Sequence, residues 1–161
     1  MTEQNLMRPP YRGRFAPSPS GYLHFGSLIT ALASFLDAKK NKGTWLVRLE
    51  DIDPPREKKG ASDYILKTLE AFGLHWDEKI LYQSQQSSYY LKIIEELFQD
   101  KTCYYCQCTR GQIKLSGGIY LGHCRQLNLP KEKSAIRVTN DQGIAQYHDL
   151  VQGYVHCNQA L

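Results

Sequence analysis

One continuous segment of the chain reads Arg14-Phe15-Ala16-Pro17-Ser18-Pro19-Ser20-Gly21-Tyr22-Leu23-His24-Phe25-Gly26-Ser27. Its prolines and glycines predict a loop between the end of a strand and the start of a helix. The first N–H groups of a helix have no partner within it and are a natural site for phosphate. Gly26 lets a ligand approach the backbone, and His24 can donate to a phosphate oxygen. The segment therefore predicts a nucleotide site, and the alternative is a structural turn with a histidine on the surface.

The sequence on either side of this loop has the pattern of a βαβ unit. Residues 13–16 predict a short buried strand, and residues 24–40 predict a helix because apolar side chains recur at helical spacing. Gly43 follows two lysines and ends this helix. A second strand is predicted directly afterwards, at Thr44–Leu49. Two strands joined by a helix predict a parallel sheet and an α/β, Rossmann-type domain.

The rest of the chain is first helical and then contains short strands. Helices are predicted at 61–72, followed by a C′ glycine at Gly73, and at 86–99. Residues 102–124 are rich in cysteine, glycine and tyrosine, and they predict an irregular segment held by a metal. Short β-like runs between residues 135 and 155 predict a small antiparallel meander.

The composition is that of a globular protein without a membrane segment. The 161 residues are 42% hydrophobic and 22% charged. No run of 18 apolar residues is present, and the polar start Met1–Asn5 lacks the apolar region of a secretory signal. The five cysteines are an odd number, which fits a reducing compartment, here the cytoplasm, better than a disulfide framework.

The charge balance permits a polyanionic partner without requiring one. The net charge is +4. Several lysines could approach RNA phosphates, although such charges also occur simply as a solvated face. These lysines are Lys39, Lys40, Lys42, Lys58, Lys59, Lys131 and Lys133.

Three cysteines have a spacing that indicates a metal site. Cys106 and Cys108 form a Cys-x-Cys pair, and Cys124 follows sixteen residues after the second of them. Three thiolates and one further donor satisfy tetrahedral Zn²⁺, and a fully ligated site of this kind is structural. His123 is the ordinary choice for the fourth ligand, while Tyr120 is an unusual one. The alternative is a set of buried, reduced thiols without a metal.

Four strings together resemble the class I aminoacyl-tRNA synthetases of the glutamyl type. His24-Phe25-Gly26-Ser27 stands where that family carries its HIGH motif, with serine in place of the last histidine. The other three strings are Leu49-Glu50-Asp51-Ile52-Asp53, Gly73-Leu74-His75-Trp76-Asp77 and Tyr82-Gln83-Ser84-Gln85. The resemblance extends from about Gly13 almost to the last residue.

This resemblance implies a ligase that activates glutamate with ATP and Mg²⁺ and then transfers it to tRNA. It implies that Arg14, Phe15, Ala16, Pro17, Ser18 and Glu50 contact glutamate. It also implies that the loop Pro17–Ser27 faces ATP, with His24 and Gly26 at the reacting phosphates. The chemistry agrees, because an arginine fork suits a carboxylate and a glutamate suits an ammonium. The alternative for Arg14 and Glu50 is a buried ion pair that joins two strand ends.

Within the family, two groups of enzymes are candidates. Pro54-Pro55-Arg56-Glu57 and the pattern Cys-x-Cys…Tyr-x-x-x-Cys resemble the glutamyl-Q tRNA(Asp) synthetases, which esterify glutamate onto the queuosine of tRNA(Asp). This resemblance selects Cys106, Cys108, Tyr120 and Cys124 as the zinc ligands. The other group is the glutamyl-tRNA synthetases. The implied domains are the N-terminal half of a Rossmann-type ATP- and glutamate-binding domain at 1–101, and a zinc-binding insertion with the start of an acceptor-type subdomain at 102–161. We expect a monomer without a membrane partner.

Two family features are absent from these 161 residues. No loop of the K-[ML]-S-K type occurs, and Lys114-Leu115-Ser116 followed by Gly117 is only a partial string. The later tyrosine and arginine contacts to glutamate also have no counterpart. Because loss of one preorganised donor costs roughly 10²–10³ in rate, we expect the chain alone to bind ATP weakly and to turn over little. The alternative functions are a fragment of a glutamyl-tRNA synthetase and a non-catalytic, zinc-stabilised module that binds nucleotide or RNA.

Overall fold

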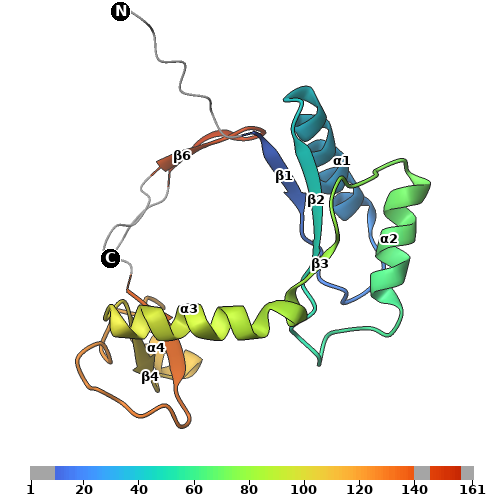
Figure 1. Cartoon of the computed structure of the whole chain (residues 1–161). Helices are drawn as coiled ribbons and strands as arrows, with labels where there is room; N and C mark the ends of the chain where they lie inside the picture. Colours follow the sequence, from blue (N-terminus) through green and yellow to red (C-terminus); the bar gives the residue numbers. More distant parts are fainter. Residues whose placement is uncertain (1–9, 140–145, 157–161) are drawn as a thin grey trace, which may run out of the picture. The chain divides into compact units, whose positions relative to one another are not determined.

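The computed structural model describes residues 10–139 and 146–156, which belong to two compact units. The first unit extends to Tyr89 and the second begins at Tyr90 (Figure 1). The N-terminal residues Met1–Asn5 lie outside the described residues. No helix in the described ranges is long and apolar enough to cross a membrane.

The first unit contains a three-stranded parallel sheet in the order β1-β2-β3. Its strands are β1 (Arg12–Phe15), β2 (Thr44–Leu49) and β3 (Leu81–Tyr82). The helix α1 (Phe25–Lys40) connects the first two strands. The predicted βαβ unit and parallel sheet are therefore confirmed. Strand β3 was not predicted, because a strand of two residues has no measurable alternation of apolar and polar side chains.

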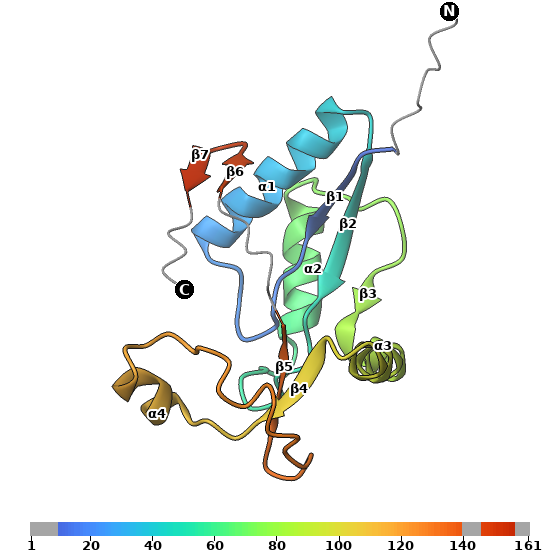
Figure 2. The ribbon, with the colours of Figure 1, turned by 90° about the vertical axis from the view of Figure 1, so that its left-hand side faces the viewer.

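Helices α1 and α2 (Ala61–Ala71) pack against the same face of this sheet (Figures 1 and 2). Alternate residues of β1 and β2 are buried there, as expected for a strand covered on one face. The rings of Trp45 and Phe35 pack edge to face, with centroids 5.2 Å apart. The core consists of Phe15, Ala31, Ala38, Trp45, Val47, Leu49, Ile65, Leu69 and Leu74.

The most deeply buried residues of α1 are small, and its larger residues Leu28 and Phe35 pack against the core while only partly buried. Ala31 and Ala38 are fully buried, whereas Ile29, Leu32 and Leu36 are 44–55% exposed. A Cβ atom on Gly13 would lie 3.1 Å from the Cβ of Ala38, so helix and strand touch almost backbone to backbone. The helical periodicity therefore predicted the element correctly, but did not show which face lies against the sheet.

Gly43 is the second point where two segments are too close for a side chain. A Cβ atom there would lie 2.4 Å from the carbonyl oxygen of Tyr11, and this oxygen accepts the N–H of Thr44 at 2.9 Å. We expect Gly43→Ala to destabilise the first unit by about 1–3 kcal/mol, because the neighbour is backbone and cannot yield. Urea denaturation measures this. Gly60→Ala should disturb no contact, because nothing lies within 4 Å of that position, although its positive φ adds some strain. An unchanged free energy of unfolding for Gly43→Ala would contradict the prediction.

The end of α2 confirms the glycine expected there. Gly73 has a φ of 71°, and its N–H donates to the carbonyl of Glu70 at 2.9 Å. The N–H of Leu74 donates to the carbonyl of Leu69, also at 2.9 Å, which completes a Schellman motif. The chain then reaches Asp77, whose carboxylate accepts the backbone N–H of Trp45 at 2.7 Å and the amine of Lys39 at 2.9 Å. These bonds, the one from Trp45 first, lower the pKa of Asp77. The string Gly73–Asp77 thus ends α2 and bonds the segment after it to β2 and α1.

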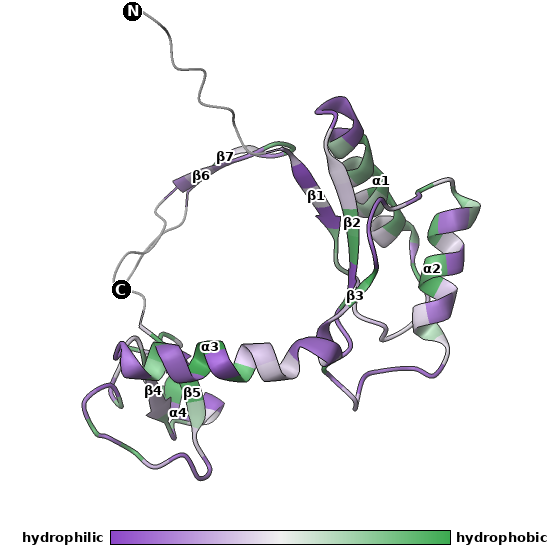
Figure 3. Cartoon of the chain, in the orientation of Figure 1, coloured by the Kyte–Doolittle hydropathy of each residue, from purple (hydrophilic) through white to green (hydrophobic). Residues whose placement is uncertain are grey.

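The 3-10 turn η1 (Gln83–Gln86) belongs to the first unit and precedes α3 (Ser87–Gln99), which continues into the second unit and carries hydrophobic and hydrophilic residues along its length (Figure 3). The second unit has more regular structure than predicted. The segment 102–124 was expected to be irregular, but it contains β4 (Cys103–Cys106) and α4 (Arg110–Leu115). Thr109 and Gln112 form a capping box that starts α4.

The predicted meander is wrong in its pairing. Strand β5 (Ala135–Val138) pairs antiparallel with β4, and not with the strand that follows it. Strands β6 (Gln146–Asp149) and β7 (Gly153–His156) form a separate antiparallel hairpin. Local sequence shows that a run is β-like, but the choice of partner depends on contacts made far along the chain.

Candidate functional site

The N-terminal part of the predicted loop is fixed by two backbone hydrogen bonds. The N–H of Glu50, just beyond β2, donates to the carbonyl of Pro17 at 3.0 Å. The N–H of Lys58 donates to the carbonyl of Pro19 at 2.9 Å. Two segments distant in sequence therefore hold the loop at the carboxyl end of the sheet, which is where ligands bind in open α/β sheets.

Most of the predicted loop residues surround one cavity of about 340 Å³. A neighbouring cavity of about 120 Å³ is lined by Ser18, Pro19 and Glu50 among others. Three of the predicted residues, Arg14, Phe25 and Gly26, line neither cavity. The predicted residues around the larger cavity are Phe15, Ala16, Pro17, Ser18, Ser20, Gly21, Tyr22, Leu23, His24 and Ser27.

His24 is the N-cap of α1, and its side chain is exposed at the edge of the larger cavity. Its Nδ1 accepts the backbone N–H of Ser27 at 3.2 Å, and its Nε2 lies 3.1 Å from the Ser27 hydroxyl. No acidic residue occupies the first turn of α1, so nothing neutralises the positive end of its dipole there. The helix N-terminus is thus suited to a phosphate, while His24 has a capping role that the sequence analysis did not foresee.

Glu50 forms an ion pair with Arg48, which lies two residues earlier on β2. Both side chains are about one-third exposed or less. The alternative considered for Arg14 and Glu50, an ion pair joining two strand ends, is not what the structure contains. Arg14 is exposed on the sheet face opposite α1, because its neighbours Gly13 and Phe15 are the buried residues of β1.

Two of the strings that carried the family resemblance are bonded to each other. The carboxylate of Asp51 accepts the backbone N–H of Ser84 at 2.8 Å and the Ser84 hydroxyl at 2.6 Å. Burial opposes ionisation of Asp51, but the hydrogen bonds from Ser84 outweigh it and lower the pKa of the carboxyl group. This contact ties the end of β2 to the turn after β3.

We expect Asp51→Asn to lower the free energy of unfolding by about 0.5–1 kcal/mol at pH 7, because the bonds are partly exposed. The folded-state pKa is depressed, so the contribution of Asp51 is present above the unfolded pKa of about 3.9 and is lost as the pH falls below it. Urea denaturation at pH 7 and at about pH 3 should show the difference between wild type and variant shrinking in acid. Glu70→Gln, on the exposed surface of α2, is the control. If the difference in the free energy of unfolding between wild type and Asp51→Asn did not change with pH, the stabilising role of the ionised Asp51 would be contradicted.

The three predicted cysteines come together in the second unit. Their sulfur atoms lie within 4.8 Å of one another, and the sulfurs of Cys108 and Cys124 are 3.5 Å apart. With Zn–S bonds of about 2.3 Å, the sulfurs of a tetrahedral site are separated by roughly 3.8 Å. The cluster therefore fits a metal ion of this size. Cys103 is also buried but belongs to no such group in the described part of the chain.

Tyr120, and not His123, directs its polar atom into this cluster. The Tyr120 hydroxyl accepts the backbone N–H of Cys124 at 3.1 Å, and Cys106 is among the groups that raise the pKa of this hydroxyl. The exposed His123 ring instead packs edge-on against Tyr120, with centroids 6.0 Å apart.

The pKa values of the cluster differ strongly. Burial opposes ionisation of Cys106, but hydrogen bonds with Tyr120 and Arg137 prevail and lower the pKa of its thiol to about 6. The hydrogen bond with Cys124 and burial raise the pKa of Cys108 to about 11. Burial, and then the bond with Cys106, raise the pKa of Tyr120. One thiolate is thus available at neutral pH, and a metal would displace the other protons as it bound.

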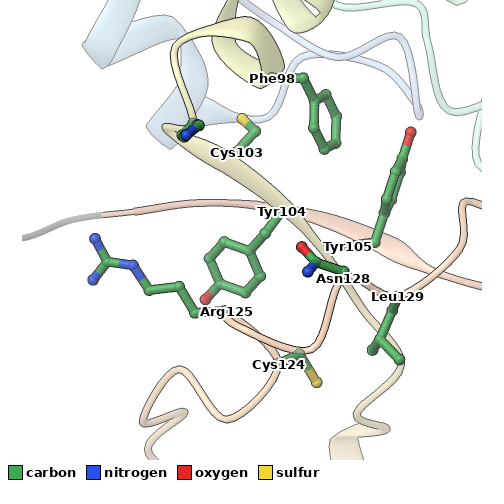
Figure 4. A pocket seen from close by; sticks show the side chains of 9 residues that line it. Phe98, Cys103, Tyr104, Tyr105, Cys124, Arg125, Asn128 and Leu129 are labelled. Carbon is green, nitrogen blue, oxygen red and sulfur yellow. The ribbon is translucent and has the colours of Figure 1, made fainter.

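A further pocket of about 400 Å³ lies beside the cluster, within the second unit (Figure 4). Aromatic side chains from α3 and β4 line it, and the rings of Phe98 and Tyr105 stack with centroids 4.6 Å apart. Cys124, Arg125, Asn128 and Leu129 also line it. No local pattern predicts this pocket, because its residues come from several separate segments of the chain.

The geometry first defines a class of protein, namely an α/β domain with a parallel sheet and a cavity at the N-terminus of its first helix. The family model for class I tRNA synthetases (E and Q), catalytic domain, matches residues 11–160. The chain belongs to this family.

The curated relatives include proteins named glutamyl-Q tRNA(Asp) synthetase. That of Colwellia psychrerythraea is 63% identical over 94% of this chain and 50% of its own length. That of Escherichia coli strain K12 is 50% identical over 94% of this chain and 49% of its own length. The chain spans about half the length of the curated relatives it matches. A crystal structure of a glutamate tRNA ligase from Elizabethkingia meningosepticum, in complex with its amino acid, is 26% identical with a TM-score of 0.73, covering 92% of this chain and 36% of that one.

Proposed function

We propose that this chain supplies the nucleotide- and glutamate-binding residues of a ligase of the glutamyl-Q tRNA(Asp) synthetase type. The proposed reaction is ATP-dependent activation of glutamate, followed by its transfer to the queuosine of tRNA(Asp). The observation that carries the proposal is the cavity of about 340 Å³ that most of the loop residues line at the N-terminus of α1. The identity of 50–63% to proteins of that name supports the choice within the family.

The proposed roles follow from the chemistry of each group. The loop Pro17–Ser27 receives ATP, with His24 and Gly26 near the reacting phosphates, and the exposed helix N-terminus attracts their charge. Residues Arg14–Ser18 and Glu50 bind glutamate, the arginine fork holding a carboxylate. The glutamate carboxylate attacks the α-phosphate and pyrophosphate leaves, assisted by Mg²⁺ when bound. No protein nucleophile is required.

The proposed metal is a structural Zn²⁺ held by Cys106, Cys108, Tyr120 and Cys124. The support is the grouping of three sulfurs and the position of the Tyr120 hydroxyl among them. Four protein ligands would leave no open position, so the ion would stabilise the fold without taking part in the reaction. The proposed domains are the α/β half-domain at 1–101 and the zinc-binding insertion, with the start of an acceptor-type subdomain, at 102–161. We propose a monomer of the cytoplasm, consistent with its free cysteines.

The experiment is glutamate-dependent ATP–pyrophosphate exchange by the purified chain, with ATP binding measured in parallel. Binding of ATP, together with exchange that requires glutamate and not glutamine, would support the proposal. Binding of ATP and tRNA without any exchange would favour a non-catalytic binding module instead. A folded chain that binds neither ATP nor glutamate would overturn the assignment of the cavity.

A further inference from the structure

The proposed metal site has an arginine against it that none of the site assignments includes. Arg137 lies on β5 and is paired in register with Tyr104 of β4, so it stands next to the strand that ends in Cys106. Its guanidinium carbon is 3.9 Å from the centroid of the Tyr120 ring. Arg137 also favours the ionised form of Cys106 and so contributes to the lowered pKa of that thiol. A single side chain therefore stacks on one proposed ligand and acts electrostatically on a second.

The environment of Arg137 indicates that it is held there for its charge. It is half-buried, while Ala135, Ile136 and Val138 of the same strand are exposed. Its Nε atom is buried and has no hydrogen-bond partner in the described part of the chain. Removing a cation from water is unfavourable unless it meets negative charge. Three thiolates around a divalent ion have a net charge of −1, and a tyrosinate would make it −2, which supplies that charge.

We propose that Arg137 is a positioning residue of the metal centre, which offsets the negative charge of the ligand set and orients the Tyr120 ring by stacking on it. The inference rests on the metal site proposed above. Groups next to the ligands commonly act in this way, and their loss weakens metal binding about 10–100-fold. A planar guanidinium can stack on an aromatic ring and donate to a sulfur at the same time, which a lysine ammonium cannot do as well.

The test is metal affinity in three variants of the whole chain, measured by competition with a chromophoric chelator for Zn²⁺. Arg137→Met keeps most of the side-chain length without the charge, and we expect about 10–100-fold weaker binding. Arg137→Lys keeps the charge without the planar group and should lie within a few-fold of wild type. Arg110→Met removes an equal charge from the exposed start of α4 and should bind like wild type.

Spectra of the Co²⁺-substituted protein provide a second measurement that mere packing would not change. We expect the sulfur-to-metal and phenolate-to-metal bands of wild type to persist in Arg137→Lys. In Arg137→Met the phenolate band should weaken, because the Tyr120 ring loses the group that orients it. A charge effect should also diminish as salt is raised, so the difference between wild type and Arg137→Met should shrink at 1 M NaCl.

The outcomes separate the inference from the site on which it rests. If wild type binds neither Zn²⁺ nor Co²⁺, the proposed metal site itself fails. If wild type binds and Arg137→Met binds equally with the same spectrum, the site stands and the role of Arg137 is overturned. If Arg137→Lys loses as much affinity as Arg137→Met, Arg137 acts through packing alone and charge compensation is overturned. Should Arg137→Met fail to fold, the comparison of Arg137→Lys with wild type still decides between charge and packing.

Discussion

Cys106→Ala is expected to abolish metal binding and to unfold the second unit around β4 and β5. The reason is that this unit buries few apolar side chains. The buried apolar residues described in this unit are Cys103, Cys106 and Cys124, whereas the first unit buries a cluster that includes Trp45 and several large aliphatic side chains. A unit this small, without an apolar core, generally needs a metal or a disulfide. Structural zinc contributes about 10–16 kcal/mol in small zinc-binding peptides, which exceeds the stability of most domains.

The measurements are zinc content, near-ultraviolet circular dichroism and limited proteolysis. In Cys106→Ala, and in wild type treated with a chelator, cleavage should begin within residues 102–139 while the first unit stays protected. Cys103→Ala is a matched control, because Cys103 is also buried but lies outside the sulfur cluster. It should keep its metal and lose only about 1 kcal/mol. A second unit that resists proteolysis without metal would show that other contacts hold it together.

The elements that sequence predicted correctly are those whose signals are local. The βαβ unit was predictable because Thr44–Leu49 is mostly apolar and the helix before it has a clear stop at Gly43. The C′ position of Gly73 was predictable because a positive φ at a helix end strongly favours glycine. The loop residues around the larger cavity were predictable because they are contiguous, so one resemblance located them together.

What sequence could not provide were contacts between distant segments. The pairing of β5 with β4 joins Ala135 to Cys106 across a long excursion of the chain, and no local pattern encodes it. Asp51, Ser84 and Asp77 stand in the strings that carry the family resemblance. Those strings did not show that Asp51 is hydrogen-bonded to Ser84 or that Asp77 is hydrogen-bonded to Trp45. Nothing in the local sequence distinguished Arg137, because its proposed role depends on its position against the Tyr120 ring.

His24→Asn is expected to weaken ATP binding about 10–100-fold while leaving the fold intact. Removing one preorganised donor to a developing charge commonly costs about 10²–10³ in rate, and part of this appears in binding. The side chain of His24 now accepts the N–H of Ser27 as the N-cap of α1. Asparagine is among the best N-cap residues, so this variant should preserve the cap and remove only the imidazole.

Comparison with His24→Ala separates the capping role of this side chain from its role in ATP binding, because His24→Ala removes both the cap and the ring. Its free energy of unfolding should fall by about 1 kcal/mol, whereas that of His24→Asn should not. Calorimetry with ATP and urea denaturation give the two quantities separately. His75→Asn, at an exposed histidine outside the cavity, is the control for both. If His24→Asn binds ATP as wild type does, His24 is only the cap of a strand-to-helix turn, and the exposed helix N-terminus alone must hold the phosphates.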